Sequence, residues 1–121
     1  MDWILTDDRP IWMQLSEQMA RRIVAGQYAP GSKLPSVREL AEDAGGNPNT
    51  MQRALSQLES DGLAVANRTA GRTVTEDTAA IEAIRHRMAR QVIAEFLSAV
   101  RALGYTRENI IKLLKEEENH E

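Results

Sequence analysis

The sequence has no cysteine, and this absence excludes disulfide scaffolds, thiolate nucleophiles, iron–sulfur clusters and zinc sites with cysteine ligands. Histidine is almost as scarce, since His86 and His120 lie too far apart to predict a metal site by their spacing. General acid–base catalysis therefore lacks its usual agent, and no glycine-rich phosphate loop follows a predicted strand. We expect neither an enzyme nor a metal or other cofactor.

Long hydrophobic runs are also missing, because no apolar stretch approaches the roughly 18 residues that a membrane-spanning helix needs. The first eight residues (MDWILTDD) lack the basic and apolar regions of a secretory signal. We therefore expect a cytoplasmic protein with no membrane partner. A length of 121 residues, with 42% hydrophobic and 27% charged residues, predicts one globular domain or one small domain with an appendage.

The net charge of −3 is unevenly distributed along the chain. Residues 1–8 contain three acids and no base, and residues 76–121 contain nine acids and seven bases. Residues 9–75 contain eight bases and six acids, so only this middle segment has a positive balance. A basic segment in an acidic chain is where we expect contact with a polyanion such as nucleic acid.

Three helices are predicted in the first half of the chain. The first covers residues 10–26, with Pro10 in its opening turn and an apolar stripe that recurs every four residues from Ile11. Ser36 opens a short second helix and forms a capping box with Glu39. Gly45 and Gly46 end the second helix before the third begins.

The third helix is predicted to start at Asn47, which caps it, and Pro48, which takes its first position. Its inward stripe consists of Met51, Ala54, Leu55 and Leu58. Two short β-type runs at 63–66 and 72–75, joined by a turn at 67–71, then predict a hairpin. Two helices joined by a glycine turn and followed by a hairpin are typical of a winged helix-turn-helix.

The outward face of the third helix is rich in hydrogen-bonding groups. At about 100° per residue, Asn49, Arg53 and Ser56 lie opposite the apolar stripe, and Gln52 flanks them. Asn and Gln side chains suit the edge of adenine, and Arg suits guanine or a phosphate. The alternative is a solvated polar face of an ordinary helical bundle.

The second half of the chain is predicted to form a long helix over residues 78–103 and a last helix after Thr106. Apolar residues of the long helix recur about every 3.7 positions, which gives a nearly straight stripe. One short neighbour cannot cover so broad a surface, so we expect packing on the last helix and across a two-fold axis. The dimerisation residues that we predict are Ile84, Met88, Val92, Phe96 and Val100.

Several separated motifs resemble the winged-helix domain of GntR-family transcription regulators, in particular the YtrA-type subfamily. They are residues 31–41 (GSKLPSVRELA), 47–55 (NPNTMQRAL) and 61–63 (DGL). The resemblance implies a mainly α fold with a small β-wing, in which a winged helix-turn-helix over residues 1–76 precedes a two-helix dimerisation appendage over residues 77–121. A tail of this length has no room for the larger effector domains of other branches.

The resemblance also implies which residues bind double-stranded DNA. Ser36 and Arg38 would meet the backbone, and Gly71 with Arg72 would approach the minor groove from the wing. The third helix would supply groove and phosphate contacts through Asn47, Asn49, Thr50, Gln52 and Arg53. Charge alone adds Lys33 and Arg68 as peripheral phosphate partners.

Three positions depart from the family pattern. Gly46 stands where an apolar residue is usual, which predicts a lost core contact and a looser turn. In the wing, Thr69 replaces a usual glycine and Thr73 stands where an aromatic residue is common.

These observations predict a homodimeric repressor that binds a palindromic operator. The alternative is a helical protein–protein adaptor or antitoxin-like module with a vestigial winged helix, which would use the long helix to bind another protein. Nothing in the sequence identifies a small-molecule effector.

Overall fold

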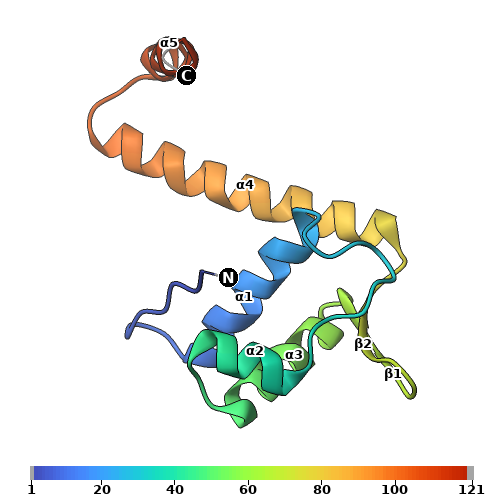
Figure 1. The fold of residues 1–121 in the computed structure, drawn as a ribbon. Coiled ribbons are helices and arrows are strands. Elements are labelled where there is room, and N and C mark those ends of the chain that lie inside the picture. Colours follow the sequence, from blue (N-terminus) through green and yellow to red (C-terminus); the bar gives the residue numbers. More distant parts are fainter. Residues whose placement is uncertain (1, 120–121) are drawn as a thin grey trace. The chain divides into compact units, whose positions relative to one another are not determined.

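The computed structural model describes residues 2–119 and is mainly helical with one antiparallel hairpin, which confirms the predicted fold class (Figure 1). The elements in chain order are α1 (Ile11–Val24), α2 (Val37–Ala44), α3 (Pro48–Ser60), β1 (Ala64–Asn67), β2 (Gly71–Val74), α4 (Thr78–Ala102) and α5 (Arg107–Glu118). The chain forms two compact units, Met1–Arg85 and His86–Glu121. The functional division that we predict at residues 76 and 77 stays a prediction.

The helices α2 and α3 begin where the sequence predicts, and α1 begins one residue later than predicted, with Pro10 at its N-cap. Ser36 and Glu39 form the capping box of α2, with the Ser36 hydroxyl oxygen accepting from the Glu39 amide at 3.1 Å. Asn47 caps α3, since its Oδ1 accepts from the Asn49 amide at 2.7 Å, and Pro48 takes the first helical position. Each cap satisfies an amide that the helix itself leaves unbonded.

The turn between α2 and α3 depends on one glycine. Gly45 adopts a φ of 69°, a left-handed conformation that residues with a Cβ rarely take. The Gly46 amide then donates to the Ala41 carbonyl at 2.9 Å and closes the helix end. A Cβ added at Gly46 would meet no atom within 4 Å, so position 46 has room for a side chain.

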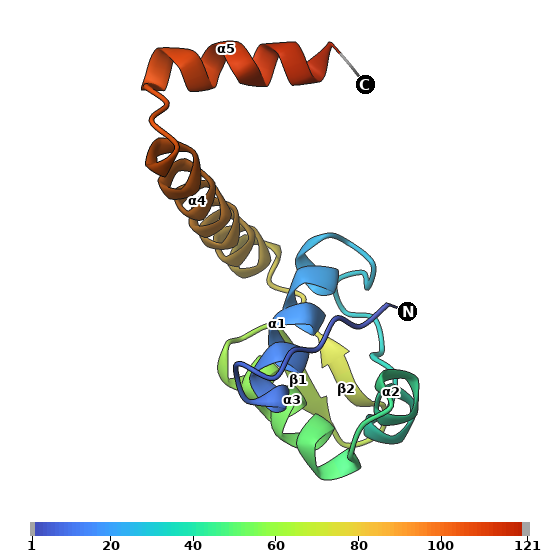
Figure 2. The ribbon, with the colours of Figure 1, turned by 90° about the vertical axis from the view of Figure 1, so that its left-hand side faces the viewer.

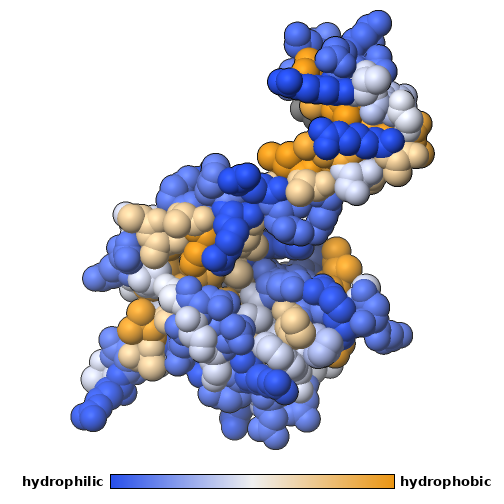
Figure 3. All heavy atoms as spheres, turned by 180° about the vertical axis from the view of Figure 1, so that it is seen from behind, coloured by the Kyte–Doolittle hydropathy of each residue, from blue (hydrophilic) through white to orange (hydrophobic). Residues whose placement is uncertain are grey.

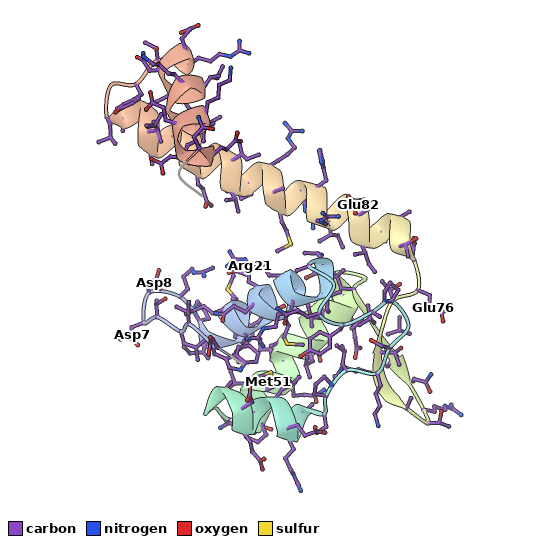
Figure 4. All side chains as sticks on the ribbon, turned by 45° about the horizontal axis from the view of Figure 1, so that its top comes forward. Asp7, Asp8, Arg21, Met51, Glu76 and Glu82 are labelled. Carbon is purple, nitrogen blue, oxygen red and sulfur yellow. The ribbon has the colours of Figure 1, made fainter. Side chains whose placement is uncertain are left out.

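The core of the first unit lies between α1, α2 and α3 and extends to the base of the hairpin. All four residues of the predicted α3 stripe are buried, and α1 and α2 both pack on α3. Met51 is one of them (Figure 4). Ile81 and Ile84 at the start of α4 are half-buried against this core. The other buried apolar residues are Leu15, Met19, Ile23, Leu34, Leu40, Ala41, Leu63, Ala64 and Val74.

The hairpin forms where the sequence predicts it, but each of its four strand ends lies one residue away from the predicted position. Its register pairs Ala64 with Val74 and Asn67 with Gly71, so β1 begins after Leu63 and β2 begins at Gly71. This register buries both Ala64 and Val74 against the core, which alternation within a short run could not decide. Figure 2 shows the two strands in the unit that also holds α1, α2 and α3.

The turn of the hairpin is held by the side chain of Asn67. Its Oδ1 accepts from the Thr69 amide and hydroxyl at 3.0 Å each and from the Ala70 amide at 3.2 Å. An asparagine that bonds the backbone ahead of it builds a turn without a glycine at the intervening position. The departure at Thr69 is therefore compensated locally.

A second contact holds the hairpin from the side of the loop before α2. Lys33 forms a bridge with Thr73, the Leu34 amide donates to the Arg72 carbonyl at 2.9 Å, and the Val74 amide donates to the Ser32 carbonyl at 2.9 Å. The strand β2 is therefore bonded along both edges. Such pairing limits how far the hairpin can move.

Ile4 and Thr6, which precede α1, are held against that helix by two glutamine side chains. Gln18 bonds both backbone groups of Ile4, at 3.0 and 2.6 Å. Gln14 accepts from the Thr6 amide at 2.7 Å and donates to the Thr6 carbonyl at 2.8 Å. Trp3 donates from Nε1 to Asp43 of α2 at 2.8 Å. These bonds fix the first residues to α1 and α2.

The second unit contains the rest of α4 and α5, and it buries little. A capping box of Thr106 and Asn109 starts α5, where Ile110 is buried. No residue of α4 is buried among those described, and Val92 and Phe96 are 55% and 41% exposed. Figure 3 shows apolar side chains gathered on the surface of these C-terminal helices.

None of the helices within residues 2–119 combines the length and the apolar character that crossing a membrane requires.

Candidate nucleic-acid interface

The outward face of α3 is exposed as the sequence predicts. Asn49, Gln52, Arg53 and Ser56 are all exposed, whereas Thr50 is half-buried. The first acidic residue of the helix is Glu59, in its last turn. The first two turns of α3 therefore present amide, guanidinium and hydroxyl groups next to the positive end of the helix dipole.

Two predicted site residues also begin helices. The Ser36 oxygen and the Asn47 Oδ1 are occupied as acceptors by the caps of α2 and α3. A hydroxyl and an amide still have donors left when their oxygens are used in this way. Ser36 and Asn47, both exposed, can therefore donate to a phosphate without giving up their caps.

Arg53 is held by an aromatic ring. Its guanidinium carbon lies 4.2 Å from the centre of the Trp12 ring on α1, at a distance typical of a cation–π contact. Stacking leaves the guanidinium edge free to donate hydrogen bonds. The sequence gives no sign of this pairing, since Trp12 and Arg53 are far apart along the chain.

The structure brings several predicted contacts around one hollow of about 560 Å³. This hollow, which we call the wing groove, lies between the start of α2, the end of α3 and the hairpin. Its lining includes the predicted site residues Lys33, Ser36, Arg68, Gly71 and Arg72, and also Glu59. Arg38 is exposed on α2 outside this lining.

Gly71 lies at the tip end of β2 with a φ of 76°, a left-handed conformation suited to glycine. A Cβ there would meet nothing within 4 Å, so the backbone at this point faces open space. A tip without a side chain allows a close approach of the backbone to a ligand.

The cations around the wing groove differ in their partners. Arg72 donates from Nε to Glu59 Oε1 at 2.5 Å, and the two side chains are 17% and 32% exposed. Within residues 2–119, by contrast, Lys33, Arg38 and Arg68 are exposed and form no ion pair. The Arg72–Glu59 pair is a contact in this groove that the sequence does not predict, because it depends on where the hairpin folds back on α3.

Nothing in the described part of the chain gathers three or more potential metal ligands. His86 is exposed on α4, and His120 lies outside the described residues.

The predicted dimerisation residues divide into two groups. Ile84 is half-buried against the core of its own unit. In the second unit Val92 and Phe96 are exposed, and Met88 and Val100 are half-buried. The helix pairs that pack most extensively are α1 with α3 and α2 with α3, and α4 with α5 is not among them. The last helix therefore leaves much of the α4 stripe uncovered.

Comparison with known proteins gives the family. Residues 13–74 match the pattern of the family described as "Bacterial regulatory proteins, gntR family". The chain is 33% identical over 115 residues to the uncharacterized HTH-type transcriptional regulator YhcF of Bacillus subtilis, covering 95% of each protein. It is 41% identical over 68 residues to the HTH-type transcriptional repressor YtrA of the same organism, covering 56% of this chain and 52% of that protein.

A solved structure has the same fold over nearly its whole length. It is a GntR family transcriptional regulator from Listeria monocytogenes, with a TM-score of 0.85 and 38% identity, and the match covers 93% of this chain and 98% of that one. Together with the exposed polar face of α3, these similarities show a DNA-binding transcription regulator rather than an enzyme. The chain belongs to the GntR family of bacterial regulatory proteins and is a YtrA-type member.

Proposed function

We propose that this regulator acts as a homodimeric repressor that binds an operator with inverted repeats. The observation that carries the proposal is the exposed face of α3, whose polar groups lie in the turns that enter the major groove in helix-turn-helix docking. Such a protein works on the chromosome, so we place it in the cytoplasm.

Each part of the winged helix has a separate task in this proposal. Asn49 and Gln52 read base edges, since an amide can bond both N6 and N7 of adenine. Arg53, stacked on Trp12, bonds a guanine or a phosphate. The remaining predicted contacts bind the backbone and position the helix: Lys33, Ser36, Arg38, Asn47, Thr50 and Arg68 on phosphates, with Gly71 at the wing tip near the minor groove.

The uncovered C-terminal helices supply the dimer. Val92, Ile93 and Phe96 on α4, with Ile111 and Leu114 on α5, are exposed apolar residues of one unit. Monomers rarely leave such a surface open, and a two-fold axis lets the same surface cover itself. Two copies related in this way present two recognition helices to two half-sites, which is why an inverted repeat is expected.

Repression is proposed from a relative. The similar region of YtrA belongs to a protein named as a transcriptional repressor. A dimer bound at a promoter represses by occupying DNA that the polymerase needs.

Selection from a random pool of double-stranded DNA tests the proposal. We expect enrichment of one palindromic site by the wild-type protein. Replacing Asn49 or Gln52 by Ala should cost about 1–3 kcal/mol of binding for each bidentate contact and relax the base preference. Ser60→Ala, at the exposed end of α3, is the matched control and should bind as the wild type does. Unchanged discrimination in both α3 variants would place base reading elsewhere.

Salt dependence gives a second measurement on the same complex. If about six phosphates are neutralised per dimer, the logarithm of affinity should fall with the logarithm of salt concentration with a slope near −5. A salt-insensitive complex contradicts the phosphate contacts.

The exposed apolar surface of the second unit also fits a protein–protein adaptor. An adaptor would enrich no DNA sequence and would bind a different protein through α4 and α5. The same selection, combined with sedimentation of the purified protein, separates it from a repressor that dimerises on itself.

A further inference from the structure

We propose that Glu59 and Arg72 form a clamp that fixes the hairpin to the end of α3, so that Arg72 positions the wing instead of contacting the DNA itself. The proposal rests on the proposed function and revises the role that the resemblance implies for Arg72, which is an approach to the minor groove from the wing. Its basis is the 2.5 Å bond from Arg72 Nε to Glu59 Oε1 inside the wing groove.

The clamp joins two elements that the fold brings together from different parts of the chain. Glu59 lies in the last turn of α3, and Arg72 is the second residue of β2. Arg72 is fixed at both ends, because its carbonyl accepts from the Leu34 amide at 2.9 Å while its guanidinium is bonded to Glu59. In the hairpin it pairs with Ala66, directly beside the pair of Asn67 and Gly71. Moving Arg72 therefore moves the wing tip.

Charge favours the clamp over a phosphate contact. Glu59 is the one acidic residue in the described lining of the wing groove, where Lys33, Arg68 and Arg72 are the bases. If Arg72 left for a phosphate, a partly buried carboxylate would remain unpaired beside the DNA. Leaving a half-buried charge without its partner has a cost that opposes the new contact.

The neighbouring arginine provides the contrast. Arg68 is exposed in the turn of the hairpin and has no ion pair among residues 2–119, whereas both members of the clamp are largely shielded from solvent. Arg68 can thus reach a phosphate without breaking a bond. Arg68→Gln is therefore the matched control for Arg72→Gln.

The experiment measures operator affinity over a range of salt concentrations, using the full-length protein and the DNA that the wild type selects. We expect Glu59→Gln and Arg72→Gln each to weaken binding about fivefold, as loss of a coupled charge pair does, with an unchanged salt slope. Arg68→Gln should instead reduce the salt slope by about one for each subunit. The double exchange E59R/R72E, which keeps the net charge and restores an ion pair, should recover affinity to within about twofold of the wild type.

Amide hydrogen exchange of the DNA-free protein tests the clamp independently of operator binding. We expect faster exchange of the amides of β1 and β2 in Glu59→Gln and Arg72→Gln, while Arg68→Gln leaves them unchanged. If the double exchange perturbs folding, circular dichroism will reveal it, and Glu59→Asp then replaces it as the variant that keeps the charge but shortens the reach.

Two results would overturn the clamp. One is tighter operator binding by Glu59→Gln together with a smaller salt slope for Arg72→Gln, since that pattern means Arg72 binds a phosphate and Glu59 competes for it. The other is unchanged hairpin exchange in both single variants. Failure of the wild type to select any DNA would refute the proposed function instead, and the exchange measurement would still decide the clamp.

Discussion

The two compact units of this chain differ in how far their apolar residues are buried. In Met1–Arg85 the stripes of α1, α2 and α3 meet in one core, and the polar face of α3 is what stays exposed. In His86–Glu121 the stripes remain largely exposed, and Ile110 is the buried residue of α5. Exposed polar groups can bind a ligand from water, whereas exposed apolar groups call for a surface to cover them.

If the chain dimerises as proposed, the two units reach their final buried surface at different stages. The first has its core, caps and paired hairpin within a single chain, so it is complete before any partner binds. In the proposed dimer, the second unit reaches comparable burial when another copy supplies the missing surface. Core substitutions in the first unit should therefore lower the free energy of unfolding. Substitutions on the apolar surface of the second unit should instead weaken association.

Leu58→Ala should produce the largest effect on the first unit. Leu58 is fully buried in α3, so removing its side chain should lower the free energy of unfolding by about 3 kcal/mol. Urea denaturation at fixed protein concentration measures the change. Ile4→Ala, at a site 75% exposed, is the control and should stay within about 0.5 kcal/mol of the wild type. Equal losses at both sites would mean that the core has been assigned wrongly.

The double replacement of Met88 and Phe96 by Ala should act on the second unit through association. Alanine keeps the helix, but loss of two apolar contacts should raise the dissociation constant of the dimer by about 30-fold, or about 2 kcal/mol. Sedimentation at several concentrations is the measurement, and operator affinity should fall with dimerisation. Ser98→Ala, on an exposed position of α4, is the control. An intact dimer in the double variant would contradict the predicted interface.

Trp12→Leu should weaken operator binding although it replaces none of the predicted DNA-binding residues. Loss of the ring beneath Arg53 removes a contact of about 0.5–1 kcal/mol, so affinity should fall about threefold. Trp12→Tyr keeps an aromatic ring and should lose less, which separates positioning of Arg53 from simple packing. Fluorescence anisotropy of labelled operator measures both variants. Equal affinities of the Leu and Tyr variants would remove any role for the stacking.

Gly46→Ala should have the smallest effect, and it should be favourable. Position 46 has room for a Cβ and no left-handed φ, so alanine should stabilise the fold by about 0.5 kcal/mol by restricting the unfolded chain. Gly45→Ala is the contrasting variant, because the left-handed φ at Gly45 should make alanine cost about 1 kcal/mol. Thermal unfolding compares the two. A destabilising Gly46→Ala would show that the turn depends on both glycines.

Much of the fold could be predicted because its signals are local. Ser36 with Glu39, Asn47 with Pro48, and the four-residue stripe of α3 each act within a few residues, and all of them appear as predicted. The bounds of the long helix and the start of the last helix also follow from periodicity and capping. The register of the hairpin does not, because it depends on which side of a short strand the core covers.

The site was less predictable for the same reason. Exposure of Asn49, Gln52 and Arg53 follows from helical geometry, so the sequence identifies that face. The partners Trp12 for Arg53 and Glu59 for Arg72 come from other elements, and only the packed fold shows them. Opposite charges or an aromatic residue at a distance along the chain do not by themselves identify such pairs.

Ser36 caps α2 and is also a proposed phosphate contact, which affects how its variants should be interpreted. Alanine there would remove a helix start and a hydroxyl donor at once, so a loss of operator affinity would mix folding with recognition. Glycine is the more informative replacement, because it is tolerated at a cap with a loss of only a few tenths of a kcal/mol while offering no donor.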